Sequence, residues 1–203
     1  MATEWQTTRQ AYAEAAAWFQ ATIALIGDRW DDPGLGEWDV RALVGHTSRS
    51  LVTVESYLAR PAPAAVIPSA VAYYQATRAL SSGPAVAQRG RDAGLALGDD
   101  PVGAVAALVA RVLALVDTMT GDEVPTTIAG GMLLRDYLVT RVFELTVHTA
   151  DLATALGLPA EPPTLPAALT LQTVCDLAVA DGRVGELLLG ATGRGLRQGF
   201  SVL

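Results

Sequence analysis

The sequence contains no lysine, and all fourteen of its basic residues are arginine. The net charge is −7 and the pI is near 4.7. A generic nucleic-acid-binding protein would show a basic patch, and none is visible, so we expect no nucleic-acid partner. The chain also has a single cysteine, Cys175, which excludes an internal disulfide framework. We expect Cys175 to be a small core residue and not a catalytic thiol.

Long hydrophobic runs are missing as well. The apolar stretch from Val102 to Leu115 is interrupted by Arg111 and is too short to span a bilayer. The opening residues, MATEWQTTRQ, are polar and lack the basic and apolar regions of a signal peptide. With 51% hydrophobic and 17% charged residues, the composition is typical of a compact protein with a sizeable core. We therefore expect a cytoplasmic protein without a membrane partner.

Apolar residues recur at helical spacing along most of the chain. Asp39 is a suitable N-cap for one of the predicted helices, and Pro101 stands in the first turn of another. A third helix stops at Gly157. The pattern predicts helices over residues 3–26, 40–58, 68–80, 101–120 and 132–156, with a loop at GDEVPTTIAGG between the last two.

The succession of helices and loops predicts an all-α fold in which residues 1–157 form a helical bundle. Residues 158–203 are too few to suggest a separate domain, and we expect them to pack on the bundle as a short C-terminal extension. This extension consists of a linker, LPAEPPTLP, a helix over about 166–180, and the stretch GELLLGATGR, which is compatible with a strand or a helix.

The helix predicted over 132–156 carries one narrow polar stripe. On a helical wheel the stripe spans about 80°, and the rest of the helix surface is mostly apolar, as in a buried helix. The stripe consists of Tyr137, Arg141, Glu144, His148 and Asp151. It either forms the one solvent-facing edge, with Glu144 and His148 as an ordinary i,i+4 pair, or faces an internal polar cleft.

The second alternative would make Glu144 and His148 ligands of a metal ion. The chain has only two histidines, and the other one, His46, lies midway along a predicted helix that can face the first. Two histidines and one carboxylate form an open zinc or iron site, and zinc suits the nitrogen-rich set best. Asp151 would then orient His148, and Arg141 would be a charge partner of Glu144.

Three segments carry a family resemblance. They are W-x-V-R-x-L-V-x-H at Trp38–His46, GGMLLRDYLVTRVFELTVHTADLATALG at Gly130–Gly157, and the ending ELLLGATGRGLRQGFSVL. Together they resemble the mycothiol-dependent maleylpyruvate isomerase family, which belongs to the DinB-like metal-binding four-helix bundles of actinobacteria. The resemblance implies a zinc site made by His46, Glu144 and His148, and it implies mycothiol, a cytoplasmic low-molecular-weight thiol, as the cosubstrate.

The chain looks like a short form of that family, since the isomerase proper carries a larger α+β C-terminal domain. We therefore predict a metal- and thiol-dependent transferase or isomerase that acts on a small electrophile. Arg141 and Arg49 are candidates for holding an anionic substrate or for tuning Glu144. The alternative is a bundle that binds a metal or a small ligand without turnover, with Asp151 or Cys175 closing the site as a fourth ligand.

Overall fold

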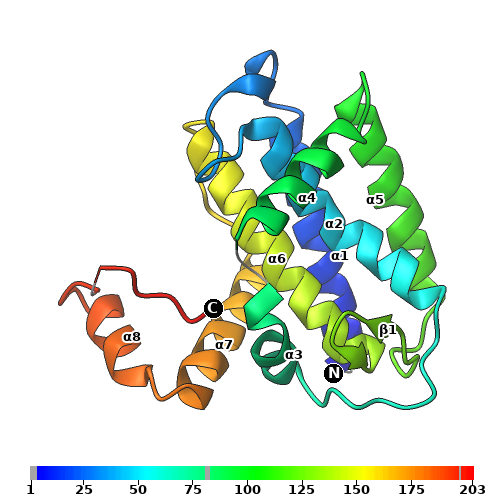
Figure 1. Ribbon diagram of the computed structural model, residues 1–203, viewed down its shortest axis with the longest axis vertical. Coiled ribbons are helices and arrows are strands. Elements are labelled where there is room, and N and C mark those ends of the chain that lie inside the picture. The colour runs from blue at the N-terminus through cyan, green and yellow to red at the C-terminus, as the bar shows by residue number, and fades with distance from the viewer. Residues whose placement is uncertain (1–3, 81–82, 197) are drawn as a thin grey trace.

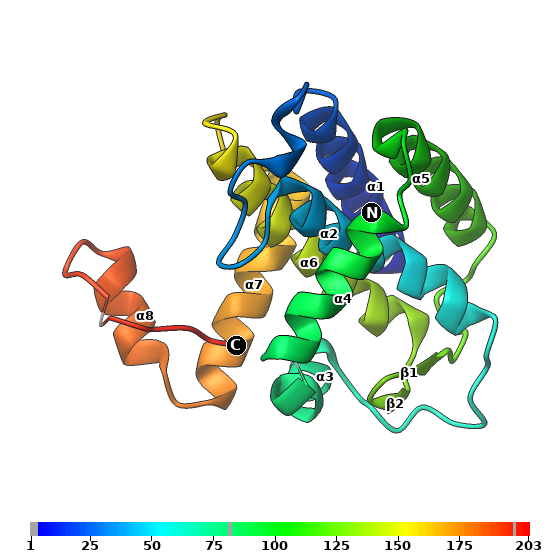
Figure 2. The same ribbon diagram turned by 45° about the horizontal axis from the view of Figure 1, so that its top comes forward.

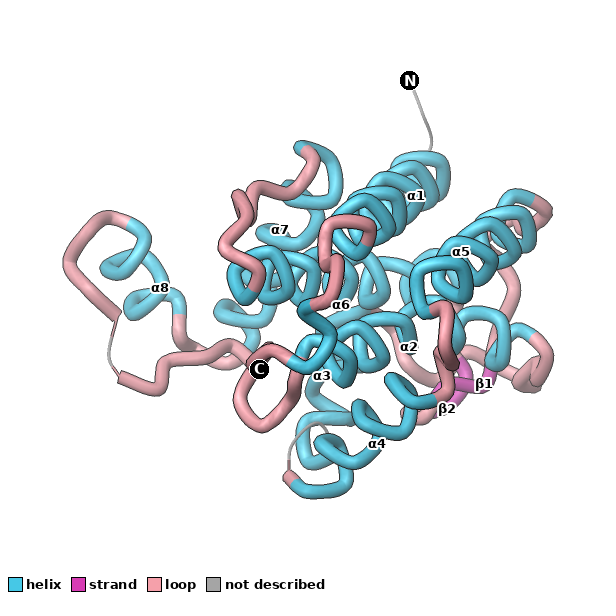
Figure 3. Tube along the Cα trace, turned by 90° about the horizontal axis from the view of Figure 1, so that it is seen from above, coloured by secondary structure: helices cyan, strands magenta, loops and turns pink. Residues whose placement is uncertain are grey.

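The computed structural model describes residues 4–80, 83–196 and 198–203. Its central part is a four-helix bundle (Figure 1). The bundle helices are α1 (Glu4–Ile23), α2 (Val40–Leu58), α5 (Pro101–Asp117) and α6 (Leu134–Ala155). Both α5 and α6 pack against α1 and α2, which closes the ring of four seen from above in Figure 3. The predicted all-α helical bundle is confirmed.

The apolar faces of these helices meet in one core. Tyr12 and Phe19 of α1, Leu43 of α2, and Leu138 and Leu145 of α6 are all completely buried in it. Residues three, four or seven positions apart share a helix face, so the periodicity in the sequence becomes a continuous buried surface. The polar stripe of α6 therefore belongs to a helix whose other faces are buried in this core.

Local capping explains several of the helix boundaries. The Asp39 carboxylate accepts a hydrogen bond from the Ala42 amide at 2.7 Å, as expected for the N-cap of α2. Gly157, with φ +66°, ends α6 in the left-handed conformation that glycine adopts at little cost. The first helix ends at Ile23, earlier than predicted, because the next residues form tighter turns. Its predicted first residue, Thr3, lies outside the described residues.

The sequence pattern did not predict α4 (Pro84–Leu95), which lies across α2 (Figure 2). Two glycines inside α4, Gly90 and Gly94, weaken the helix signal. The structure shows why they are there. A Cβ atom on Gly90 would meet the Trp38 ring at 2.7 Å, and one on Gly94 would meet the backbone of α2 at 2.6 Å. The glycines therefore lower helix propensity but allow close packing.

The predicted loop before α6 contains a short hairpin of β1 (Thr126–Thr127) and β2 (Gly130–Gly131). The Thr127 hydroxyl donates a hydrogen bond to the Gly130 carbonyl at 2.7 Å, and Gly130 has a φ of +122°. Strands of two residues are too short to show an alternating pattern, so the sequence could not reveal them.

The remaining helices lie around the bundle. They are α3 (Ala70–Thr77), α7 (Thr164–Ala180) and α8 (Val184–Ala191), with 3₁₀ turns η1 (Arg29–Asp31) and η2 (Arg78–Leu80). α7 packs against α1 and α6, and α3 packs against α6 and α7. α8 lies next to α7 and extends away from the bundle in Figures 1 and 2.

The extension differs from the sequence expectation in detail. GELLLGATGR belongs to helix α8 and its C-terminal turn, so the strand alternative is wrong. α7 begins at Thr164, inside the predicted linker, because Pro166 is tolerated in the first turn of a helix. The boundary after residue 157 between bundle and extension stays a prediction.

The predicted burial of Cys175 is wrong, since its side chain is exposed on α7. α7 packs on the bundle with one face only, and Cys175 lies on the other face, which a short apolar stretch could not reveal. In the described part of the chain, no helix is long and apolar enough to cross a membrane.

Candidate metal centre

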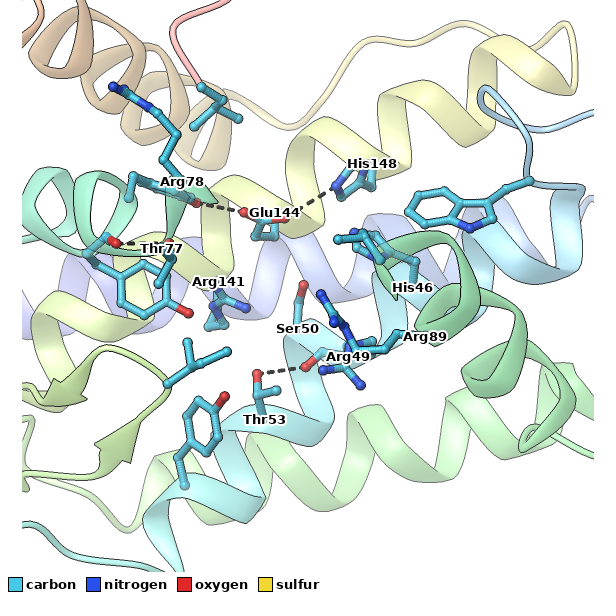
Figure 4. Close-up of a pocket in the computed structure, with 17 residues that line it drawn as sticks. His46, Arg49, Ser50, Thr53, Thr77, Arg78, Arg89, Arg141, Glu144 and His148 are labelled. Atoms are coloured by element: carbon cyan, nitrogen blue, oxygen red, sulfur yellow. Dashed lines mark hydrogen bonds and ion pairs between the residues drawn. The ribbon is translucent and has the colours of Figure 1, made fainter. Parts of the chain in front are cut away.

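His46, Glu144 and His148 come together between two bundle helices. α2 supplies His46, and α6 supplies the other two from successive turns. One ligand atom of each residue lies within 4.8 Å of those of the other two, and Figure 4 shows the three side chains directed toward one another. The polar stripe of α6 therefore faces an internal cleft, because α2 covers it, and the solvent-edge alternative does not hold.

His148 has a partner on each ring nitrogen. Nδ1 lies 3.0 Å from Asp151 Oδ2, and Nε2 lies 3.3 Å from Glu144 Oε2. Burial lowers the pKa of His148, but the hydrogen bonds to the two carboxylates outweigh burial and raise this pKa to about 9. Asp151 thus lies where the sequence predicted an orienting acceptor for His148.

Glu144 stays ionised in this half-buried position. Burial raises its pKa, but the hydrogen bond with His148, the positive charge of Arg141 and a hydrogen bond from Tyr74 together lower this pKa to about 2. The Tyr74 hydroxyl donates to Glu144 Oε1 at 3.0 Å. A carboxylate that is already ionised needs to lose no proton before it binds a cation.

His46 is the complementary case of a neutral imidazole. Burial and, to a smaller extent, the nearby charge of His148 lower its pKa to about 4. Its ring lies 4.4 Å from the ring of Trp38, centroid to centroid. Its Nδ1 atom is buried and has no hydrogen-bond partner in the described part of the chain. Buried polar atoms are normally paired, so this unpaired nitrogen is available to a ligand.

These observations test whether a metal ion fits. The site offers a neutral imidazole with an unpaired buried nitrogen, an ionised carboxylate, and a second imidazole that an acceptor orients. Two nitrogens and one carboxylate oxygen form a donor set that suits a divalent ion such as zinc. Neither Asp151 nor Cys175 joins the cluster of possible ligands found among the described residues. The set is therefore compatible with an open three-ligand site.

Arg141 lies deep in the same cleft and is only 8% exposed. Its Nε donates to the Thr140 hydroxyl at 3.0 Å, and its guanidinium carbon lies 4.9 Å from the ring centre of Tyr137 and 5.6 Å from that of Tyr73. Packing between two aromatic rings holds the cation in place. Of the two roles expected for Arg141, the geometry favours tuning of Glu144, because the positive charge lowers the pKa of that carboxyl.

The three possible ligands form part of the wall of a larger pocket of about 520 Å³. Three further arginines line it, namely Arg49, Arg78 and Arg89. Figure 4 shows Arg49 and Arg89 next to each other, beside Ser50. The space is far larger than one ion requires, so the pocket can hold a small organic molecule next to the candidate metal site.

Residues 200–203 also reach this pocket. Val202 is buried in the main core, and Leu203 lines the pocket. Arg78 fixes this segment, because its guanidinium pairs with Asp181 at the end of α7 and donates to the Val202 carbonyl at 3.3 Å. The sequence did not predict a role for Tyr74, Arg78, Arg89 or Leu203, since neither spacing nor composition signals contacts between distant segments.

The chain matches the family model described as mycothiol maleylpyruvate isomerase N-terminal domain. The match covers residues 11–153 and includes His46, Glu144 and His148. Neither the curated proteins nor the solved structures gave a match to the chain. The resemblance seen in the sequence is thereby confirmed over most of the chain, which belongs to the mycothiol maleylpyruvate isomerase N-terminal domain family.

Proposed function

We propose that this protein is a zinc-dependent enzyme that uses mycothiol to transform a small electrophilic substrate. The observation that carries the proposal is the cluster of His46, Glu144 and His148 in the wall of a 520 Å³ pocket. The family description supports mycothiol as the cosubstrate. Because mycothiol is a cytoplasmic thiol, we propose that the reaction takes place in the cytoplasm.

The ligand set supports catalysis more than a structural role. A structural zinc site is closed by four protein ligands, whereas three ligands leave a position for a reactant. When bound there, zinc would supply a Lewis acid that lowers the pKa of a coordinated thiol, which is near 8.5 when free. His46, Glu144 and His148 would hold the ion, and Asp151 would keep the His148 ring in the required orientation.

The arginines of the pocket support an anionic electrophile. The Arg49 guanidinium makes no hydrogen bond or ion pair with the part of the chain that the structure describes, and it lines the pocket next to Ser50. An arginine presents a planar fork that matches a carboxylate. We therefore assign Arg49 the binding of a substrate carboxylate, while the buried Arg141 stabilises the ionised form of Glu144.

The reaction itself is either thiol transfer or thiol-assisted isomerisation. In a transferase the thiol remains attached to the product, and in an isomerase it leaves again after bond rotation. The family description names an isomerase of maleylpyruvate, an anionic electrophile, which agrees with the arginines in the pocket.

The metal site is tested first. Glu144→Gln keeps the size of the side chain but removes its charge, and His46→Ala removes a ligand. Both variants should lose zinc, measured by elemental analysis after gel filtration. Glu55→Gln, at an exposed ion pair with Arg111, is the matched control and should retain zinc. Full zinc occupancy in His46→Ala would refute the site.

The reaction is tested with the zinc-loaded protein and mycothiol. We expect a mycothiol adduct with monochlorobimane, detected by mass spectrometry, or isomerisation of maleylpyruvate, detected by chromatographic separation of the two isomers. Glu144→Gln should lose either activity. Arg49→Gln should raise KM for maleylpyruvate more than for the uncharged monochlorobimane. Zinc binding without mycothiol binding or turnover would instead indicate a non-catalytic binding module.

A further inference from the structure

The two oxygens of Glu144 have different partners, and Tyr74 is the partner of one of them. Glu144 Oε2 lies 3.3 Å from Nε2 of His148, on the side of the possible ligands. Oε1 accepts the hydrogen bond from Tyr74 at 3.0 Å. Oε2 therefore faces the other members of the cluster and accepts no hydrogen bond from Tyr74.

The Tyr74 hydroxyl is held firmly in this position. It also lies 3.2 Å from the Thr140 carbonyl, one turn before Glu144 on α6. The Tyr74 ring packs 5.3 Å from that of Phe143 and 5.7 Å from that of Tyr73, and the residue is only 6% exposed. The hydroxyl has one hydrogen to share between these two acceptors, and the Glu144 carboxylate is both the nearer and the charged one, so it takes the stronger hydrogen bond.

We propose that Tyr74 is a positioning residue that makes Glu144 a one-oxygen ligand and so keeps a coordination position free for a reactant. The proposal rests on the proposed metal site. A carboxylate can bind a metal ion through one oxygen or through both. Because the hydrogen bond from Tyr74 occupies Oε1, binding through both oxygens would compete with that bond.

Removal of the Tyr74 hydroxyl should change how the metal is coordinated without removing the metal. In Tyr74→Phe the ring still fills its place between Tyr73 and Phe143, so the fold is kept. Oε1 then has no phenol donor and becomes free to bind the ion together with Oε2. The second oxygen would take the position that an incoming thiol needs.

Cobalt(II) is the probe, because the positions and intensities of its visible absorption bands change with the number and kind of its ligands. At equal cobalt content we expect the band positions of Tyr74→Phe to differ from those of the wild-type protein, because a carboxylate oxygen has replaced the ligand at the open position. Tyr73→Phe removes a phenol from the neighbouring residue of the same pocket and is the matched control. Its spectrum should equal that of the wild-type protein.

A second measurement uses azide, a small anion that binds open positions on cobalt. Azide should alter the wild-type and Tyr73→Phe spectra but not that of Tyr74→Phe. Equal spectra and equal azide responses in the wild-type protein and Tyr74→Phe would overturn the role of Tyr74 alone. A wild-type protein that binds no cobalt would overturn the proposed metal site, and this inference with it.

Discussion

His148 carries a proton in the metal-free protein, although burial opposes the charge. Its hydrogen bonds to Asp151 and Glu144 raise its pKa to about 9, while His46 has a pKa of about 4. At pH 7, His148 is therefore cationic and His46 is neutral. A histidine must be neutral to bind a metal, so binding at neutral pH displaces one proton from His148.

The first prediction concerns the pH dependence of zinc affinity. Below the pKa of His148, protons compete with the metal, so affinity should rise about tenfold per pH unit from pH 7 and level off near pH 9. Competition with a chelating dye of known pH dependence measures this profile. A constant affinity over the same range would show that His148 is neutral or is not a ligand.

Asp151 should also affect the pH dependence of zinc affinity. Its hydrogen bond raises the pKa of His148, so Asp151→Asn should move the start of the affinity plateau to lower pH. Loss of the orienting carboxylate should also lower the plateau affinity by about tenfold. Asp176→Asn, a change of the same kind at an exposed carboxylate of α7, is the control and should leave both features unchanged. An unshifted profile in Asp151→Asn would contradict the positioning role.

Sequence patterns predicted some of these site residues but not others. Glu144, His148 and Asp151 follow one another at helical spacing, so a wheel was enough to align them. Tyr74 lies 70 residues before Glu144, and its contact depends on how α3 packs against α6. Tyrosine also fits an ordinary apolar core position, so no sequence pattern singles out Tyr74.

At the scale of elements, the crossing of α2 and α4 decides where His46 lies. Gly45 precedes His46, and a Cβ atom on Gly45 would lie 2.1 Å from the Gly94 backbone nitrogen and 2.5 Å from its Cα. Backbone atoms at these distances cannot be relieved by a side-chain rotation. Both glycines are thus required for the close approach of the two helices.

Gly45→Ala should therefore push α2 and α4 apart. We expect a loss of about 3 kcal/mol of unfolding free energy, and a fall in Tm of about 6–12 °C in thermal denaturation. Zinc affinity should also decrease, because His46 is the next residue. Gly185→Ala is the control, since α8 has open space at that position, and its Tm should not decrease. Equal Tm values for both variants would contradict the close packing.

Prediction of the elements succeeded where apolar periodicity or a cap was strong, as in α2, α5 and α6. It failed for α4, whose glycines lower helix propensity and are explained only by the neighbouring α2 and Trp38. It also misjudged Cys175, because apolar periodicity does not tell which face of α7 meets the bundle. Tertiary packing determines both features, and local propensity cannot report it.

At the scale of the whole molecule, residues 200–203 connect the end of the described chain to the candidate site. Val202 is buried in the same core as the bundle, whereas Leu203 is 49% exposed at the pocket wall. The segment follows α8, which extends away from the bundle, and returns to lie near α3 and α7 (Figure 1). The core thus includes a residue from outside the family match.

If this segment is part of the cooperative fold, Val202→Ala should cost about 1.5 kcal/mol, from the apolar groups removed from the core. The corresponding fall in Tm is about 3–6 °C. Leu203→Ala, at the neighbouring and more exposed position, should change Tm by much less. Circular dichroism during heating compares the two. Identical melting of the wild-type protein and Val202→Ala would show that the segment contributes nothing to the folded unit.

The all-α class, the order of the main helices and the polar stripe of α6 follow from local propensity and helical periodicity, so they can be predicted from the sequence. Packing between distant segments turns the stripe toward a pocket, places His46 beside Glu144 and His148, and adds Tyr74, Arg78 and Leu203. The reason is physical: periodicity identifies a face of a helix, whereas the residue opposite that face depends on packing between segments that are far apart in the chain.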